Sequence, residues 1–200
     1  MDTAPRSGAW KAHAEEAALV SRAQRGDRAA FLTLLHYYDR SVYRLVYALV
    51  RDLEKAGALT HETFVRAWKD ILHIPAGQTF YAWLTRLARG LAITHTRRRV
   101  SAPDLGVHDL PREVDPAAEA EAARVVVDPT DAERAVQCER AFSELNVDQQ
   151  TILFLRVSER LSYSEIAKTL DIPFGATISR LATARAALRT RLAGPGRKAA

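Results

Sequence analysis

The sequence is poor in residues that form disulfides or bind metals: one cysteine and six histidines occur among 200 residues. The single cysteine, Cys138, excludes an internal disulfide framework and any multi-cysteine zinc site. It has no resolving cysteine, so we expect a small packing residue rather than a redox switch. The histidines lack metal-ligand spacing such as H-E-x-x-H, and no glycine-rich phosphate loop follows a strand. We therefore expect no metal, no other cofactor and no enzymatic activity.

Long apolar runs are also missing. The longest falls well short of a membrane span, and the N-terminus, MDTAPRSGAW, lacks the apolar core of a secretion signal. The hydrophobic content of 48% and the charged content of 26% are ordinary for a folded chain. The sequence therefore predicts a folded cytoplasmic protein that does not insert into a membrane.

The net charge of +5 is unevenly distributed. Residues 1–100 carry a net +7, residues 101–140 a net −6 and residues 141–200 a net +4. Four of the eight prolines lie in 101–135, a segment without a sustained helical period. We predict two basic domains, 15–100 and 136–193, an acidic linker over 101–135, and short tails over 1–14 and 194–200. The basic domains favour a polyanionic partner.

Apolar residues at spacings of three and four predict helices throughout the first domain. We expect them over about 15–24, from a cap at Asp27 to about 49, from Thr60 to about 71, and from Thr79 to Arg99. The run Pro75-Ala76-Gly77 separates the last two. Strand signals are nearly absent, so the predicted fold class is all-α.

Aromatic and basic residues gather in the last of these helices. Phe80, Tyr81 and Trp83 precede Arg86 and Arg89, and the helix ends in a run of arginines at 97–99. Taken singly, each aromatic is best interpreted as a core residue and each arginine as a solvated one. Together they suit a surface that stacks unpaired bases and holds phosphates, as in the binding of single-stranded or melted nucleic acid.

The second domain carries the strongest local motif. Ser162 and Glu165 form an S-x-x-E capping box that opens a short helix, and Asp171 suits a left-handed turn at its end. A longer basic helix then begins near Phe174 or Gly175, and a further helix is predicted over 147–157. This order is typical of a helix-turn-helix, although a helical hairpin without DNA-binding function has the same pattern.

Several segments resemble the extracytoplasmic-function sigma factors, the compact two-domain class of bacterial transcription initiation factors. The resemblance rests on RGDRAAFLTLLHYY, LTHETFVRAWKDI and TFYAWLTRLARGLAITHTRRR in the first domain, and on SELNVDQQTILFLRVSERLSYSEIAKTLDIPFGATISRL in the second. It implies two helical domains, called sigma region two and sigma region four. Region two would bind RNA polymerase core and open the minus-10 promoter element, and region four would read the minus-35 element.

The resemblance also implies roles for individual residues. Contacts to the clamp coiled coil of the polymerase core would come from Leu59, His61, Glu62, Phe64 and Trp68. Contacts to minus-10 DNA would come from Ile74, Phe80, Tyr81, Trp83, Arg86, Arg89, Gly90, Arg97 and Arg98, with a flipped base held near Ile74 and Gly90. Contacts to minus-35 DNA would come from Ala176, Ile178, Ser179, Arg180, Thr183 and Arg185.

The implied partners are RNA polymerase core (clamp coiled coil and flap), promoter DNA in duplex and melted form, and an anti-sigma factor. We expect Phe64→Ala or Glu62→Ala to weaken core binding without unfolding the chain. The pattern departs from the family at Gly90, where asparagine is common, and at Ala176 and Ile178, where a hydroxyl and a basic side chain are common. These changes leave open whether DNA specificity is lowered or redirected.

Two other functions remain open from the sequence. One is a plain helix-turn-helix regulator that binds duplex DNA as a dimer, which would footprint DNA without polymerase. The other is a sigma-like decoy that binds an anti-sigma factor and never supports transcription. Promoter melting that depends on core polymerase distinguishes a sigma factor from both.

Overall fold

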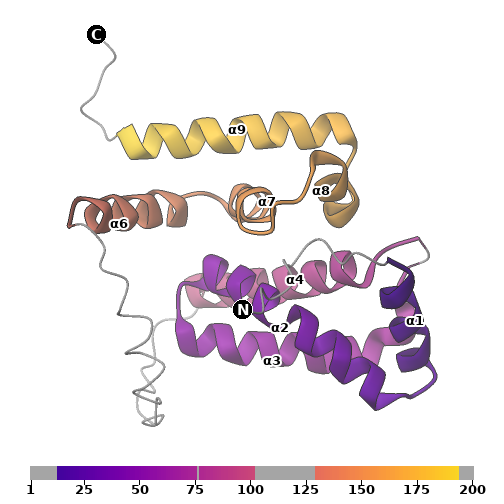
Figure 1. Cartoon of the computed structure of the whole chain (residues 1–200). Helices are drawn as coiled ribbons and strands as arrows, with labels where there is room; N and C mark the ends of the chain where they lie inside the picture. The colour runs from indigo at the N-terminus through magenta and orange to yellow at the C-terminus, as the bar shows by residue number, and fades with distance from the viewer. Residues whose placement is uncertain (1–12, 76, 102–128, 194–200) are drawn as a thin grey trace.

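The computed structural model describes residues 13–75, 77–101 and 129–193, and within them every regular element is a helix. The first domain contains α1 (His13–Gln24), α2 (Arg28–Val50), α3 (Leu53–Asp70), the short 3-10 helix η1 (Ile71–His73) and α4 (Phe80–Ser101). The second contains α6 (Pro129–Ser143), α7 (Val147–Val157), α8 (Tyr163–Leu170) and α9 (Phe174–Ala193). The predicted all-α fold class is confirmed. Figure 1 shows the second domain stacked on the first, with α9 on the side away from it.

Side-chain caps set the helix starts of the first domain. The Asp27 carboxylate accepts a hydrogen bond from the Ala30 N–H at 3.1 Å, as the sequence predicts. That bond and the Arg22 guanidinium lower the pKa of Asp27. Asp52 caps α3 in the same way, through the Lys55 N–H at 3.0 Å.

Helix α3 starts well before the predicted Thr60. The Asp52 cap opens it at Leu53, and the weakly patterned stretch Lys55-Ala56-Gly57-Ala58 is helical. Ala56 is fully buried, so this first turn packs into the core. The prediction placed the start too late because small residues give almost no apolar period.

Helix α2 forms the centre of the first domain, packed against α1, α3 and α4. Its inward face is fully buried at Leu34, Val42, Leu45 and Val46. Apolar residues at spacings of three and four form one face of an amphipathic helix, and this face packs against the core. A left-handed residue, Arg51, ends α2 and reverses the chain into α3.

The second domain contains the predicted helix-turn-helix. Ser162 and Glu165 form a reciprocal capping box at the start of α8. Asp171 ends α8 in the left-handed conformation with φ 55°, and Pro173 directly precedes α9. A second capping box, formed by Asn146 and Gln149, opens α7 over the predicted residues 147–157. The inward stripe of α9 is buried through Ala184 but has become exposed by Leu192.

Helix α6 begins at Pro129, seven residues before the predicted start of the second domain at 136. Proline suits the first turn of a helix, where its missing N–H would have no partner. The sequence signal was weak here because the exposed helix has little apolar periodicity. The rest of the predicted linker, 102–128, lies outside the described residues, as do 1–12 and 194–200.

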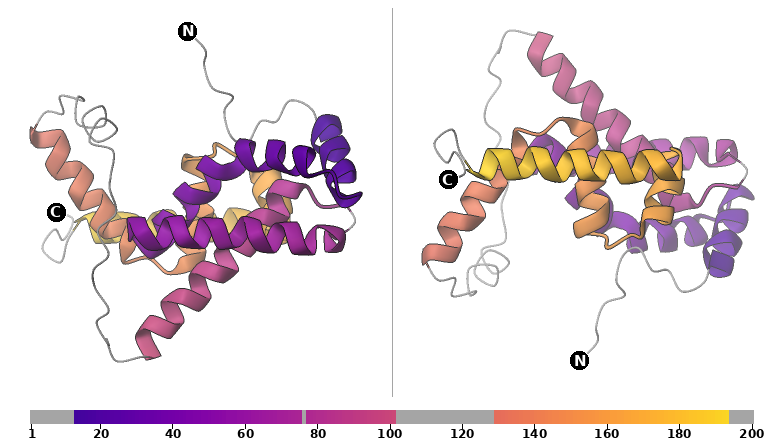
Figure 2. Two further views of the ribbon diagram at one scale, coloured as in Figure 1. Left: turned by 90° about the horizontal axis from the view of Figure 1, so that it is seen from below. Right: turned by 90° about the horizontal axis from the view of Figure 1, so that it is seen from above.

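The two domains pack directly against each other. Helix α8 contacts α4 and helix α7 contacts α2. Their buried apolar side chains form one continuous cluster that includes members of both domains, such as Leu34 and Leu155. The two views of Figure 2 show α4 beginning within this contact and extending outward past it.

No helix among the described residues is long and apolar enough to cross a membrane. Within the same residues, no group of three or more His, Cys, Asp or Glu side chains is placed to hold a metal ion.

We predict that Ser162→Ala lowers the free energy of unfolding by about 1 kcal/mol, because the Glu165 N–H loses its side-chain acceptor. Ser164→Ala is the matched control, since that exposed serine lies inside the helix. Urea unfolding followed by circular dichroism measures both. Equal stability of the two variants would contradict the role of the cap.

Candidate polymerase and DNA interface

Only some of the α3 residues that are predicted to bind polymerase are exposed to solvent. His61 is exposed, and the partly exposed Glu62 accepts from Arg66 one turn later at 2.6 Å. Leu59 and Phe64 are buried, with 8% and 4% of their surface exposed. Trp68 is half-buried, with its ring 5.0 Å from that of Phe31.

The burial of Phe64 corrects the expectation that Phe64→Ala weakens polymerase binding without unfolding the chain. Its side chain packs inside the first domain, so removing it leaves a cavity rather than a missing partner contact. The outward face of α3 instead carries His61, Val65 and Lys69, spaced four residues apart. The sequence analysis missed Val65, although its spacing from His61 places both on one helix face.

The three aromatic residues at the start of α4 lie in the core. Phe80, Tyr81 and Trp83 are 2%, 8% and 7% exposed. The Phe80 ring lies 5.8 Å from that of Tyr38 and 6.4 Å from that of Phe31. The expected surface of alternating aromatics and arginines is therefore absent from this arrangement, since the rings point inward.

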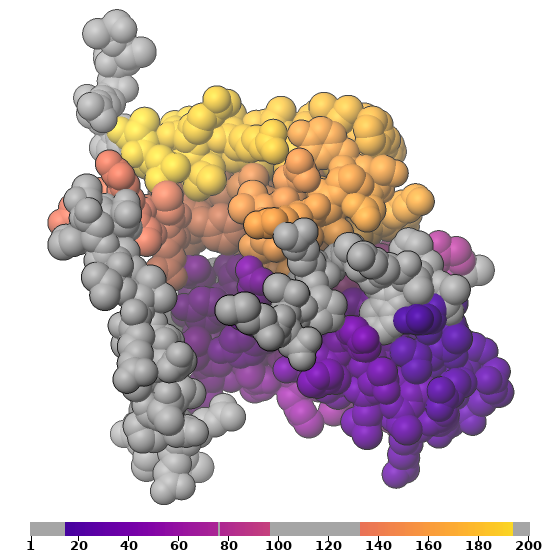
Figure 3. Space-filling view, in the orientation of Figure 1, coloured from indigo at the N-terminus to yellow at the C-terminus, as the bar shows by residue number. Residues whose placement is uncertain are grey.

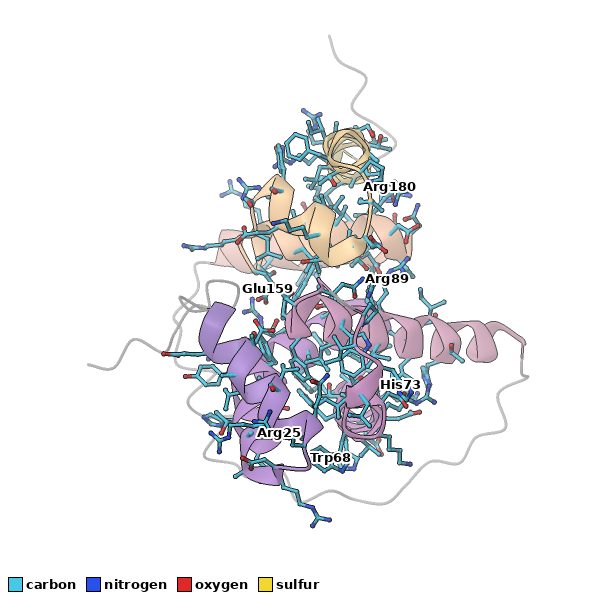
Figure 4. The ribbon with its side chains drawn as sticks, turned by 90° about the vertical axis from the view of Figure 1, so that its right-hand side faces the viewer. Arg25, Trp68, His73, Arg89, Glu159 and Arg180 are labelled. Atoms are coloured by element: carbon cyan, nitrogen blue, oxygen red, sulfur yellow. The ribbon has the colours of Figure 1, made fainter. Side chains whose placement is uncertain are left out.

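The arginines that follow lie at the edge of this buried turn and have acidic partners. Arg86 lies 3.5 Å from the Asp171 carboxylate and donates to Gln78. Arg89 pairs with Asp148. Both acids belong to the second domain. Figure 4 labels Arg89 where the two domains meet.

Gly90 and Thr94 occupy the exposed side of α4. A Cβ atom added at Gly90 would meet nothing within 4 Å, so this position has room for a side chain. The side chains of Arg97 and Arg98 lie outside the described residues.

Tyr81 has polar neighbours in both domains. Its hydroxyl lies 3.3 Å from the Ser41 hydroxyl, and its N–H donates to the buried Glu16 carboxylate at 3.2 Å. Burial raises the pKa of Tyr81, and the negative charge of Glu159 from the second domain raises it further. Burial and Glu16 likewise raise the pKa of Tyr38. Both phenols therefore stay neutral and serve packing.

A cavity of about 540 Å³ lies beside the segment between η1 and α4. The first domain contributes Ile74 and residues 77–79 to its wall, together with residues of α1. The second domain contributes Leu161, Glu165, Lys168 and Thr169. Ile74 therefore lines a cavity, as a base pocket would require, but Gly90 is not among the lining residues.

Helix α9 presents most of its predicted DNA-contacting residues openly. Ile178 is 45% exposed. Four further predicted residues are exposed, namely Ser179, Arg180, Thr183 and Arg185, whereas Ala176 is half-buried. Figure 3 shows α9 forming the upper surface of the molecule, and Figure 4 labels Arg180 there.

Two further side chains of α9 lie at this surface. Phe174, at the start of α9, is 54% exposed and was missed by the sequence analysis. Its signal was its position, an aromatic directly after the Asp171 turn. Arg185 lies 3.5 Å from the Tyr163 hydroxyl. Cys138 is an exposed free thiol on α6, so the expectation that it is a packing residue is wrong.

The geometry defines a two-domain helical protein with an open recognition helix on one domain. Comparison with known families supports this class. The model described as Sigma-70 region 2 matches residues 34–101, and the model described as Sigma-70, region 4 matches residues 136–188.

Known relatives match over most of the chain. RNA polymerase sigma-H factor of Pseudomonas aeruginosa is 30% identical over 177 residues, covering 85% of this chain and 90% of that protein. ECF RNA polymerase sigma factor SigW of Bacillus subtilis is 25% identical over 185 residues, covering 86% and 94%. The chain belongs to the extracytoplasmic-function sigma factors of the sigma-70 family. Members of this family are transcription initiation factors without enzymatic activity.

Solved structures share the fold. CnrH in complex with the cytosolic domain of CnrY matches with a TM-score of 0.64 and 20% identity, covering 91% of this chain and 99% of that one. The sigma factor RpoE from Bartonella quintana, in complex with the anti-sigma factor NepR, matches with a TM-score of 0.58 and 19% identity, covering 82% and 98%.

We predict that Phe64→Ala lowers the free energy of unfolding by about 3 kcal/mol, because a large buried ring is removed. Val65→Ala, on the exposed face of the same helix, should change it by less than about 0.5 kcal/mol. Urea denaturation measures both. If Phe64→Ala unfolds at the wild-type midpoint, the ring does not contribute to the core as described.

Proposed function

We propose that three surfaces of the chain divide the work of promoter recognition. The exposed face of α3 contacts RNA polymerase core, α4 and the segment before it engage the minus-10 element, and the outer face of α9 reads the minus-35 element. The observation that carries this proposal is the open face of α9, the second helix of a helix-turn-helix in a chain of the sigma-70 family. The protein would act in the cytoplasm, where polymerase is found.

Contact with polymerase would centre on His61, Glu62 and Val65. These side chains place a carboxylate, an imidazole ring and an apolar group on one helix face. Leu59, Phe64 and Trp68 would contribute indirectly, by holding α3 against the core of the domain. A helix face of this kind suits binding to another helix.

Contact with minus-10 DNA would depend on Arg86 and Arg89 for phosphates and on the cavity beside Ile74 for an extruded base. Arg97 and Arg98 would add phosphate contacts. Extruding a base costs a few kcal/mol of stacking, which binding of the base and of the separated strand can offset. Gly90 offers no side chain to that strand, which suits relaxed base recognition at this position.

Contact with minus-35 DNA would combine phosphate and base contacts on α9. Arg180 and Arg185 are exposed cations suited to phosphates. Ile178 and Thr183 carry methyl groups that can meet a thymine methyl in the major groove. Ala176 and Ser179 would allow the helix backbone to approach closely.

An anti-sigma factor is the proposed regulator. RpoE of Bartonella quintana was solved in complex with the anti-sigma factor NepR, and CnrH in complex with CnrY. Exposed apolar side chains on α3, such as Leu53 and Val65, offer a surface for such a partner in competition with polymerase.

Transcription from a library of genomic promoter fragments tests the function. We expect discrete transcripts when core polymerase and this chain are both present, and none with either alone. A footprint on duplex DNA without core would favour a plain regulator. Tight anti-sigma binding with no transcripts would favour a decoy.

We predict that Arg180→Gln weakens promoter binding by the holoenzyme and reduces its salt slope by about one, the loss of a single phosphate contact. Arg25→Gln is the control, because this exposed arginine lies in the turn after α1, at the other end of the molecule in Figure 4. Filter binding over a range of salt concentrations measures the slope. An unchanged slope for Arg180→Gln would remove the phosphate role of this residue.

A further inference from the structure

Two large apolar side chains are exposed at the start of α9. Phe174 is 54% exposed and Ile178 is 45% exposed. Among the large apolar side chains that are exposed in the described part of the chain, no other two lie four positions apart on one helix. Residues four positions apart are neighbours on a helix surface, so these two form one apolar patch. An exposed apolar patch that the fold does not cover marks a site of contact with another molecule.

The helical turn that carries this patch is anchored in the second domain. Thr177, which lies between the two residues, is fully buried, and its N–H donates to the Pro173 carbonyl at 3.0 Å. The Thr177 hydroxyl lies 3.4 Å from the same carbonyl oxygen. The backbone that presents Phe174 and Ile178 is therefore held in place before any partner binds.

The surface beside the patch is open. Gly175 is exposed, and a Cβ atom added there would meet nothing within 4 Å, so no packing contact of the described chain requires glycine at this position. Figure 3 shows α9 on the upper surface of the molecule, with no described segment above it. A base pair therefore has room to approach the helix beside Phe174 and Ile178.

The charge of α9 indicates which molecule occupies this surface. The helix contains four arginines and no acidic residue, which favours a polyanion. Arg185 follows Ile178 by seven positions, about two helical turns, and therefore lies on the same face. The face is thus apolar at its N-terminal end and basic further along. This order suits a recognition helix, whose N-terminal residues meet base edges while its cations hold phosphates.

An apolar side chain can recognise one feature of the major groove. The C5-methyl group of thymine is the apolar group that base pairs present there, whereas the other groups are hydrogen-bond donors and acceptors. The side chains of Phe174 and Ile178 cannot donate or accept hydrogen bonds. A G·C pair packed against them would lose hydrogen bonds to water without replacement, so the patch favours thymine.

The spacing of the two side chains also predicts the spacing of the thymines. Phe174 and Ile178 are about 6 Å apart along the helix axis, the rise of four residues, and successive base pairs are about 3.4 Å apart. The two side chains therefore reach two base pairs that are one or two steps apart. Thr183 lies five positions after Ile178, about 140° round the helix, so Phe174 rather than Thr183 shares the face of Ile178.

We propose that Phe174 and Ile178 form a thymine-methyl reader, which selects a minus-35 element with two thymines one or two base pairs apart. The inference rests on the proposed role of α9 in minus-35 binding. It assigns a consequence to the isoleucine at 178, where a basic side chain is common: DNA specificity is redirected toward thymine rather than lowered.

Replacement of thymine by uracil tests the reader, because it deletes the methyl group and keeps the base pair. The full chain with core polymerase first selects its preferred sequences from a pool of random duplexes. One selected duplex is then remade with each thymine replaced in turn, and filter binding at constant salt concentration measures each affinity. We expect two positions in the upstream part of the footprint at which uracil weakens binding by about fourfold, the effect of one buried methyl group.

Protein variants assign each methyl group to a side chain. Phe174→Ala should bind more weakly and become insensitive to uracil at one of the two positions, and Ile178→Ala should do so at the other. Leu192→Ala is the matched control, because it removes an exposed apolar side chain at the far end of the same helix. This control should keep both methyl effects at their wild-type size. Circular dichroism should show wild-type helix content in all three variants, since each substitution lies at an exposed position.

Equal binding of thymine and uracil duplexes at every upstream position would overturn the reader, as would a pool that yields no preferred sequence. Weaker binding of Phe174→Ala with both methyl effects intact would also overturn it, because the ring would then contact polymerase rather than a base. The transcription assay tests the proposed function separately. Core-dependent transcripts can persist when no methyl effect is found, and their absence would refute the proposed function even if uracil weakens binding.

Discussion

Helix α4 is the element on which the rest of the structure depends, because it is packed from two sides. Its first six residues, Phe80–Thr85, are all buried. A helix with one covered face leaves about half of such a run in water, so this degree of burial needs neighbours on both sides. The first domain supplies α2 and α3, and the second supplies α8. The packing of this one helix therefore determines how the two domains lie against each other.

Local signals explain which predictions succeeded. The caps at Asp27 and Ser162 and the turn at Asp171 involve residues a few positions apart, and the structure contains all three. The starts of α3 and of the second domain were predicted too late because no such strong local signal marks them. The small residues at 56–58 and the beginning of α6, which is exposed throughout 133–140, lack the apolar period on which such predictions depend.

The site was less predictable than the fold. An aromatic next to an arginine has the same sequence pattern whether the ring points inward or outward, and the surroundings of the buried Tyr81 include Glu159, which lies far along the chain. The pairing of Arg89 with Asp148 joins residues 59 positions apart. No periodicity encodes such a contact. Because the two domains belong to one chain, they meet at a high local concentration, and weak ion pairs are enough to hold them together.

Asp171 links two properties that are usually separate. It holds the left-handed turn of the helix-turn-helix, where glycine would be less strained, and it is also the partner of Arg86. A substitution by glycine would preserve the turn of the helix-turn-helix and remove the ion pair with Arg86. One side chain therefore serves both the turn within the second domain and the contact between the two domains.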